Sequence, residues 1–190
     1  MAEEKFSDLG RIEAIEKLFE GTGYTPWTGF WTESEAKGNI THHSARLLLE
    51  GIDFDLTYFP LKHLGYKSVI SAVGELYASM AAPKTLAVTL GISAKLDFGH
   101  IRQLWEGVVA AAKQHRLKHI SLDLTPSPNG LCIAVSATGE TSCLTAKRRP
   151  AAKSMDLICI SDNLGAAYMG MQVLERERRK FDKTKDDSIL

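Results

Sequence analysis

Three aspartates stand where metal or phosphate chemistry is possible. Asp53 and Asp55 are two residues apart, so their side chains share one face if the strand before them continues. Such a pair could hold Mg²⁺, although a solvated strand edge is the commoner interpretation. Asp123 follows an apolar run and precedes Thr125-Pro126, which places it at the end of a predicted strand. Ligand sites gather at strand ends, and a turn-forming aspartate is the equal alternative.

Histidines and basic residues give weaker signals. His42 and His43 are adjacent, so on a strand their rings point to opposite sides, which is poor geometry for binding one metal ion. The run Lys147-Arg148-Arg149 could meet a phosphate, but a solvated loop is the commoner interpretation. The basic residues of 176–180 fall in the last turns of a predicted helix, where cations suit the helix dipole, and we assign them no ligand. The sequence contains no P-loop, no Gly-x-Ser-x-Gly elbow and no His-Glu-x-x-His motif.

The composition is that of a globular protein of one domain. The chain has 190 residues, 44% hydrophobic and 24% charged, with 23 basic and 23 acidic side chains. This balance argues against a nucleic-acid partner, and no apolar run approaches the ~20 residues that span a bilayer. The polar start at 1–5 does not resemble a secretory signal. The three cysteines, Cys132, Cys143 and Cys159, are widely spaced, so we expect reduced thiols and a cytoplasmic location.

Hydrophobic periodicity predicts the elements that position these residues. Pro60 and Asp97 are suited to begin helices. Helices are predicted at 7–20, 61–80, 98–115 and 164–181, and strands at 45–50, 85–92, 118–124, 130–138 and 156–161. Residues 22–40 are aperiodic and predicted to be loop. The mixed order implies a sheet with helices packed on it, and 61–80 and 98–115 should share one face.

Several segments closely resemble thiamine-monophosphate kinases. Residues 50–55, Glu-Gly-Ile-Asp-Phe-Asp, match the E-G-V-H-F-D of that family, and residues 60–67 match its P-L-K-H-L-G-Y-K. Further matches follow in the same order, at 75–83 (family S-D-I-Y-A-M-x-x-x-P), 120–123 (V-G-G-D), 149–158 (R-x-G-A-x-x-x-D-x-I) and 164–170 (L-G-A-A). The resemblance covers about 44–175 with little gapping. It is to the N-terminal half of this branch of the AIR-synthase-related superfamily.

The resemblance implies an α/β (α+β) fold of the AIR-synthase N-terminal type. Its sheet is mixed and four-stranded, with helices on one face, and pairs across a homodimer to close a barrel. The implied organisation is an N-terminal helix and loop at 1–40, the domain at 41–163, and a helix and tail at 164–190 that begin an absent C-terminal half. The family transfers the γ-phosphoryl group of ATP to thiamine monophosphate, with ATP and Mg²⁺ in a cleft lined by acidic loops.

The resemblance marks five positions as nucleotide or metal site: Arg46, Asp53, Glu75, Asp123 and Arg149. The chain departs from the family at or beside several of them. Arg46 replaces the carboxylate of the strand, and Asp53 replaces the histidine of E-G-x-H-F. Glu75 keeps an acid with one more methylene, and Asp123 retains the acid of a Gly-Gly-Asp turn that has lost its glycines. The early Gly-Asp-Asp loop has no counterpart at 29–40. Only Glu75 and Asp123 remain as metal ligands, forming a weak site.

The charge of Arg46 favours a degenerate site. Two unit charges ~4 Å apart interact by about 4 kcal/mol at an effective dielectric of ~20, and a guanidinium in place of a carboxylate changes this interaction by about twice as much. We therefore expect a dimeric scaffold or ligand binder in which binding of ATP and Mg²⁺ is weak or lost. One alternative is a working kinase, or a fragment of one. Another is a binding module that shares only the fold.

Overall fold

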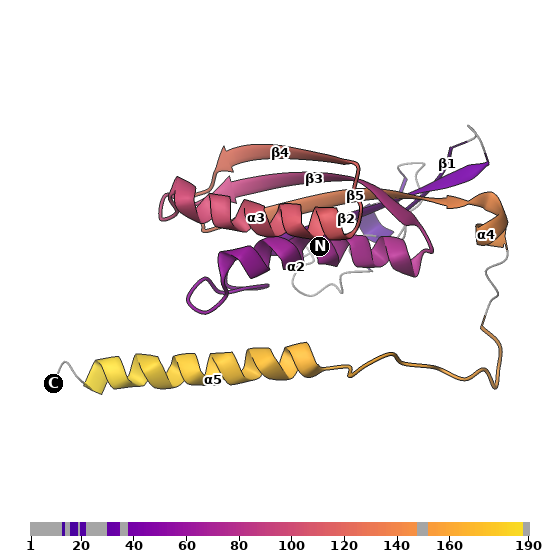
Figure 1. Cartoon of the computed structure of the whole chain (residues 1–190). Coiled ribbons are helices and arrows are strands. Elements are labelled where there is room, and N and C mark those ends of the chain that lie inside the picture. Colours follow the sequence, from indigo (N-terminus) through magenta and orange to yellow (C-terminus); the bar gives the residue numbers. More distant parts are fainter. Residues whose placement is uncertain are drawn as a thin grey trace.

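A computed structural model describes residues 13, 16–18, 20–21, 30–34, 38–147 and 152–187. Its centre is a mixed sheet in the order β1-β2-β5-β3-β4, with β3 and β4 parallel and the other neighbours antiparallel. The strands are β1 (Phe30–Ser34), β2 (Asn39–Leu49), β3 (Ala82–Ile92), β4 (His119–Pro126) and β5 (Cys132–Ser142). Figure 1 shows α2 (Leu61–Ala78) and α3 (Phe98–Gln114) on one side of this sheet.

The four strands expected in the sheet are all present, and a fifth strand joins its edge. β1 arises in the segment predicted to be loop and pairs with the first part of β2, from Phe30 opposite His43 to Ser34 opposite Asn39. Beyond His43, β2 has β5 as its one strand neighbour in the described part of the chain. Arg46 therefore lies where β2 becomes an edge strand, which leaves its side chain partly exposed.

The two central helices begin where the sequence predicts. Pro60 precedes α2, and Asp97 caps α3 by accepting a hydrogen bond from the His100 backbone N–H at 2.9 Å. The helices cross closely because Gly65 and Gly107 lack side chains: a Cβ on either residue would overlap a carbonyl group of the other helix. This crossing holds α2 and α3 as one layer over the sheet.

The two faces of the sheet differ in what they carry. Side chains on the helix-facing side form the core, including Leu48, Val88 and Val135. The other side, here called the open face, carries two rows of residues that share a register: Ala45, Ser136, Ala87 and Ser121, and then Leu47, Ala134, Thr89 and Asp123. No described helix covers this face (Figure 1). The adjacent histidines divide as predicted, with His42 buried and His43 exposed.

The last part of the chain departs from the prediction. After the short helix α4 (Cys143–Lys147), residues 152–165 lead to α5 (Ala166–Asp187) without helix or strand, with turns at 154–155 and 164–165 and an extended segment between them (Figure 1). The buried strand predicted at 156–161 is wrong: these residues form no strand and are exposed. A strand needs a partner for its backbone groups, and none lies beside this segment in the described chain. The helix predicted at 7–20 falls mostly outside the described residues.

Candidate functional site

Arg46, Glu75 and Ser44 form a charged cluster between β2 and α2. Ser44 and Arg46 are two residues apart, so both side chains project from the helix-facing side of β2. Glu75 on α2 contacts both of these side chains. Its Oε2 accepts a hydrogen bond from Ser44 Oγ at 2.5 Å, and its Oε1 is ion-paired with Arg46 Nη2. Ser44 is fully buried, while the two charged side chains are 37% and 43% exposed. Both oxygens of Glu75 are thus engaged within the protein.

Asp123 lies apart from this cluster. It is an interior residue of β4, and its side chain belongs to the open face, opposite the side that carries Arg46. β4 is three strand spacings from β2, or about 14 Å in the plane of the sheet. Its Oδ1 accepts a hydrogen bond from the Leu124 N–H at 3.0 Å. The structure therefore does not bring Glu75 and Asp123 into one coordination sphere.

Asp53 and Asp55 occupy a turn, because β2 does not continue as far as these residues. The strand ends at Leu49, and Gly51 turns the chain at a φ of +83°, a conformation that glycine adopts at little cost. Asp53 Oδ2 then accepts a hydrogen bond from the Leu49 N–H at 2.8 Å, and its carbonyl oxygen accepts one from Lys67 Nζ at 2.7 Å. Asp53 therefore closes the turn and links it to α2.

Asp55 connects the same turn to α5. Its Oδ1 accepts a hydrogen bond from the Thr57 N–H at 2.8 Å, and its Oδ2 is ion-paired with Arg178. Hydrogen bonds from the Thr57 side chain and backbone, and then the nearby Arg178, hold the pKa of Asp55 below its usual value. Tyr58 donates a hydrogen bond to Glu175 at 3.3 Å, and its pKa is raised by burial and then by that carboxylate.

A groove of about 700 Å³ lies between this turn and α5. Aromatic side chains from both sides line it, including Phe54, Phe59 and Tyr168, together with the charged residues Lys67 and Arg178. Lys67 Nζ lies 5.1 Å from the centre of the Phe59 ring, so the cation rests over an aromatic face. The groove has the size and mixed lining of a small-molecule site.

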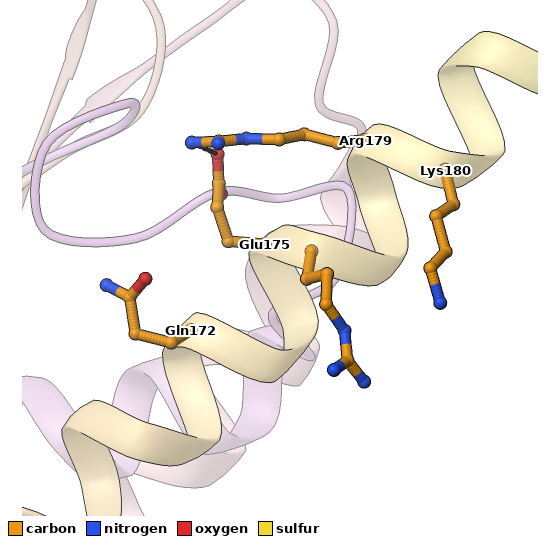
Figure 2. Close-up of a pocket in the computed structure, with 5 residues that line it drawn as sticks. Gln172, Glu175, Arg179 and Lys180 are labelled. Carbon is orange, nitrogen blue, oxygen red and sulfur yellow. Dashed lines mark hydrogen bonds and ion pairs between the residues drawn. The ribbon is translucent and has the colours of Figure 1, made fainter.

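Three other basic residues of α5, Arg176, Arg179 and Lys180, line a second hollow of about 260 Å³, shown in Figure 2. Glu175 and Arg179 point toward each other there, with 3.5 Å between Oε1 and Nη2, while Lys180 points away and pairs with Glu177 at 3.2 Å. Pairs at these spacings are ordinary features of an exposed helix. Arg149, the remaining candidate from the sequence, lies outside the described residues.

The described part of the chain holds no group of three or more His, Cys, Asp or Glu side chains arranged to bind a metal ion. It also contains no helix long and apolar enough to cross a membrane. Sequence reasoning missed Ser44, Glu175 and Arg178. Ser44 could have been found from its two-residue spacing to Arg46, whereas contacts between residues 58 and 175 have no local signal.

Comparison with known proteins supports the family resemblance. No family model matches the chain. A thiamine-monophosphate kinase of Bacillus subtilis is 25% identical over 130 residues, which are 68% of this chain and 40% of that protein. One from Buchnera aphidicola is 31% identical over 143 residues, covering 74% and 42%. One from Aquifex aeolicus is 22% identical over 184 residues, covering 94% and 56%. The chain spans about half the length of these curated relatives.

Solved structures agree on the fold. AaThiL complexed with AMPPCP and TMP superposes with a TM-score of 0.67 at 18% identity, over 75% of this chain and 45% of that one. A crystal structure of thiamine monophosphate kinase from Aquifex aeolicus gives 0.63 at 21% identity, over 73% and 44%. The predicted α+β fold with a mixed sheet is confirmed, and so is the resemblance to thiamine-monophosphate kinases over part of their length.

Proposed function

We propose that this chain is a thiamine-monophosphate-kinase-like domain that has lost phosphoryl transfer and acts as a dimeric scaffold or ligand binder. The observation that carries the proposal is the ion pair of Arg46 and Glu75. By resemblance, both positions belong to metal-facing carboxylates in the family. Two carboxylates this close need a cation between them. Here the cation is the guanidinium of Arg46 itself.

The residues present do not fit Mg²⁺. This ion needs oxygen ligands in near-octahedral geometry, usually with one or two carboxylates. Glu75 has both oxygens occupied by Ser44 and Arg46, and Arg46 keeps its positive charge because a guanidinium does not deprotonate in proteins. Asp123 lies on the other face of the sheet. Phosphoryl transfer depends on metal to neutralise the developing charge, so we expect the transfer to fail here.

The proposed dimer uses the open face of the sheet. Its two rows consist mainly of Ala, Ser and Thr, which would let a second sheet approach to the usual ~10 Å. Leu47, on the same face, is 58% exposed, and its side chain would be buried by the second sheet. Light scattering should therefore show at least a dimer, and Ala134→Arg, which puts a charge in the middle of the face, should lower the associated mass. A monomer for the unmodified chain at every accessible concentration would refute this dimer.

The test of lost catalysis is a coupled kinase assay with ATP, Mg²⁺ and thiamine monophosphate, joined to calorimetric titration of Mg²⁺. The unmodified chain should show no turnover and no measurable Mg²⁺ binding. The double variant Arg46→Asp with Glu75→Asp should gain Mg²⁺ affinity, because it restores two adjacent carboxylates and removes the internal cation. Turnover by the unmodified chain would overturn the proposal, and no gain in affinity would show that these positions do not face a metal.

The alternative is an ATP- and Mg²⁺-dependent thiamine-monophosphate kinase, active alone or as part of a longer enzyme. The observation in its favour is the 22–31% identity to proteins of that name. The groove between residues 51–59 and α5 would then be the place to look for a ligand. Magnesium-dependent ATP binding by the unmodified chain distinguishes this alternative from the scaffold.

A further inference from the structure

An apolar extended segment lies exposed between α4 and α5. Met155, Leu157 and Ile158 are each more than 90% exposed, and Ile160 is 60% exposed. The backbone of 155–161 takes part in no strand. Soluble proteins seldom leave a continuous apolar stretch uncovered, and such surfaces usually mark a contact with another element.

β4 presents a matching gap at the edge of the sheet. Within the described residues β4 pairs only with β3, so the peptide groups on its outer edge have no strand partner. On the helix-facing side, Leu122 and Leu124 are 39% and 52% exposed, although their neighbours on β3, Val88 and Leu90, are buried. An apolar groove of about 270 Å³ runs between these leucines and α3, with Phe98 at its rim 81% exposed. Unpaired apolar edges readily accept another strand.

We propose that residues 155–161 of one copy of this chain add as a strand to the outer edge of β4 in a second copy, and that the exchange is reciprocal. Backbone hydrogen bonds would pair the two strands, and alternate side chains of the added strand would fill the groove beside α3. Residues 157–161 are free of turns, whereas Met155 lies in a turn with a φ of +76°, which would have to open. Once extended, the seven residues would span about 23 Å, close to the length of the eight-residue β4. Reciprocal exchange gives a closed two-fold dimer, because each copy donates one strand and accepts one.

Position in the fold favours a second copy over the same chain. In Figure 1 the extended segment runs beyond the helix layer, while β4 lies on the opposite side of that layer. Charge also matches. Asp156 lies near the start of the segment and Asp162 directly follows it. Lysines lie near both ends of β4: Lys118 directly precedes the strand, and the residues on either side of Lys95 line a hollow with its last residues, Leu124 to Pro126. This contact uses the sheet edge and is separate from the open-face dimer proposed above.

The native Cys159 allows a direct test by disulfide trapping. In a background with Cys132→Ser and Cys143→Ser, single cysteines are placed on β4: Ser121→Cys and Thr125→Cys on one face, Leu122→Cys and Leu124→Cys on the other. One face must match that of Cys159, so mild oxidation should give a covalent dimer in at least one variant. The yield should be several-fold above that of Cys159 alone and of the control Gly74→Cys, an exposed position on α2 with open space around it.

Mixing isotopically light and heavy chains before oxidation identifies the partner. A disulfide between light and heavy peptides supports exchange between copies, whereas a disulfide within one chain overturns it, as does a yield no higher than that of the controls. In the Ala134→Arg background, which lacks the open-face contact, Ile158→Asp should weaken the remaining dimer at least about tenfold in analytical ultracentrifugation, while Leu144→Asp, at an exposed leucine outside the segment, should not. Ala134→Arg tests the open face and should leave the trapping unchanged, so the two proposals fail separately.

Discussion

Arg46 on β2 and Glu75 on α2 are joined by an ion pair, and the Ser44 hydroxyl donates a hydrogen bond to the same carboxylate. A strand and a helix 29 residues apart in the sequence thus place opposite charges together at a position that the resemblance assigns to two like charges. Reversing the sign of Arg46 should therefore convert an internally neutralised pair into one that requires an added cation.

The first prediction is that Arg46→Asp lowers thermal stability and that Mg²⁺ restores part of it. The pair is partly exposed, so its loss together with the new repulsion should cost about 1 kcal/mol. Thermal unfolding with and without millimolar Mg²⁺ measures both effects. Arg46→Lys keeps the charge and should show little change and no response to Mg²⁺. An equal response to Mg²⁺ in both variants would mean that the ion binds elsewhere.

The second prediction concerns pH and the contact between Asp55 and Arg178. Because the folded pKa of Asp55 is lowered from 3.8, the native state binds fewer protons than the unfolded state near that pH. The stability from this carboxylate is complete above about pH 4 and is lost as the pH falls through the lowered pKa. Asp55→Asn should therefore be less stable than the unmodified chain at pH 6, and the difference should shrink toward pH 3.

The matched control for this pH effect is Thr57→Val. This change removes the side-chain hydrogen bond to Asp55 but keeps the backbone N–H that donates a hydrogen bond to the same carboxylate. It should raise the pKa of Asp55 and move the loss of stability to higher pH. Carboxyl carbon titration by NMR reads the pKa directly. A value for Asp55 at or above 3.8 in the unmodified chain contradicts the prediction.

The parts of the fold that local sequence could predict are those with local signals. Pro60 and Asp97 begin α2 and α3 as expected, since a fixed φ and a capping carboxylate act within one turn of the helix. The apolar runs at 85–92 and 130–138 form the neighbouring strands β3 and β5. They were predictable because each strand contributes apolar side chains to the core under the helices. Strand lengths were underestimated where polar residues extend β2 to Asn39 and β5 to Ser142.

What failed depends on partners distant in the sequence. Residues 156–161 have strand composition but no neighbouring strand in the described chain, so composition alone gave a wrong prediction. β1 forms because it pairs with the start of β2, and the aperiodic sequence of β1 gives no local signal of that pairing. For the site, the resemblance selected Arg46 and Glu75 separately, but only the fold shows that they meet and that Asp123 lies on the opposite face.

The third prediction concerns Glu50, whose Oε2 accepts a hydrogen bond from the buried Leu131 N–H at 2.7 Å. Glu50→Ala leaves this N–H without its acceptor and should cost about 1–3 kcal/mol in the free energy of unfolding. Glu50→Gln keeps an acceptor oxygen and should cost less. Urea denaturation gives the energies, and amide hydrogen exchange at Leu131 should accelerate in the alanine variant alone. Equal energies for the two variants would show that the hydrogen bond contributes little.

The last prediction uses three glycines of the helix layer. A Cβ at Gly107 would overlap the Lys62 carbonyl group, and one at Gly65 would overlap that of Leu104, so alanine at either position must push α2 and α3 apart. Backbone atoms cannot give way cheaply, and we expect each substitution to cost at least about 1–3 kcal/mol. Gly74, also on α2, has no heavy atom within 4 Å of the Cβ position.

Gly74→Ala is therefore the matched control and should stabilise the protein by about 0.5–1 kcal/mol, because alanine loses less backbone entropy in a helix. Chemical denaturation of the three variants should give opposite signs for residues of the same type. If Gly65→Ala and Gly107→Ala were also neutral or stabilising, the helices would have to be farther apart than the structure places them. Because α2 carries Glu75, a widened crossing should also weaken its contact with Arg46, so in either alanine variant Arg46→Asp should cost less than in the unmodified chain.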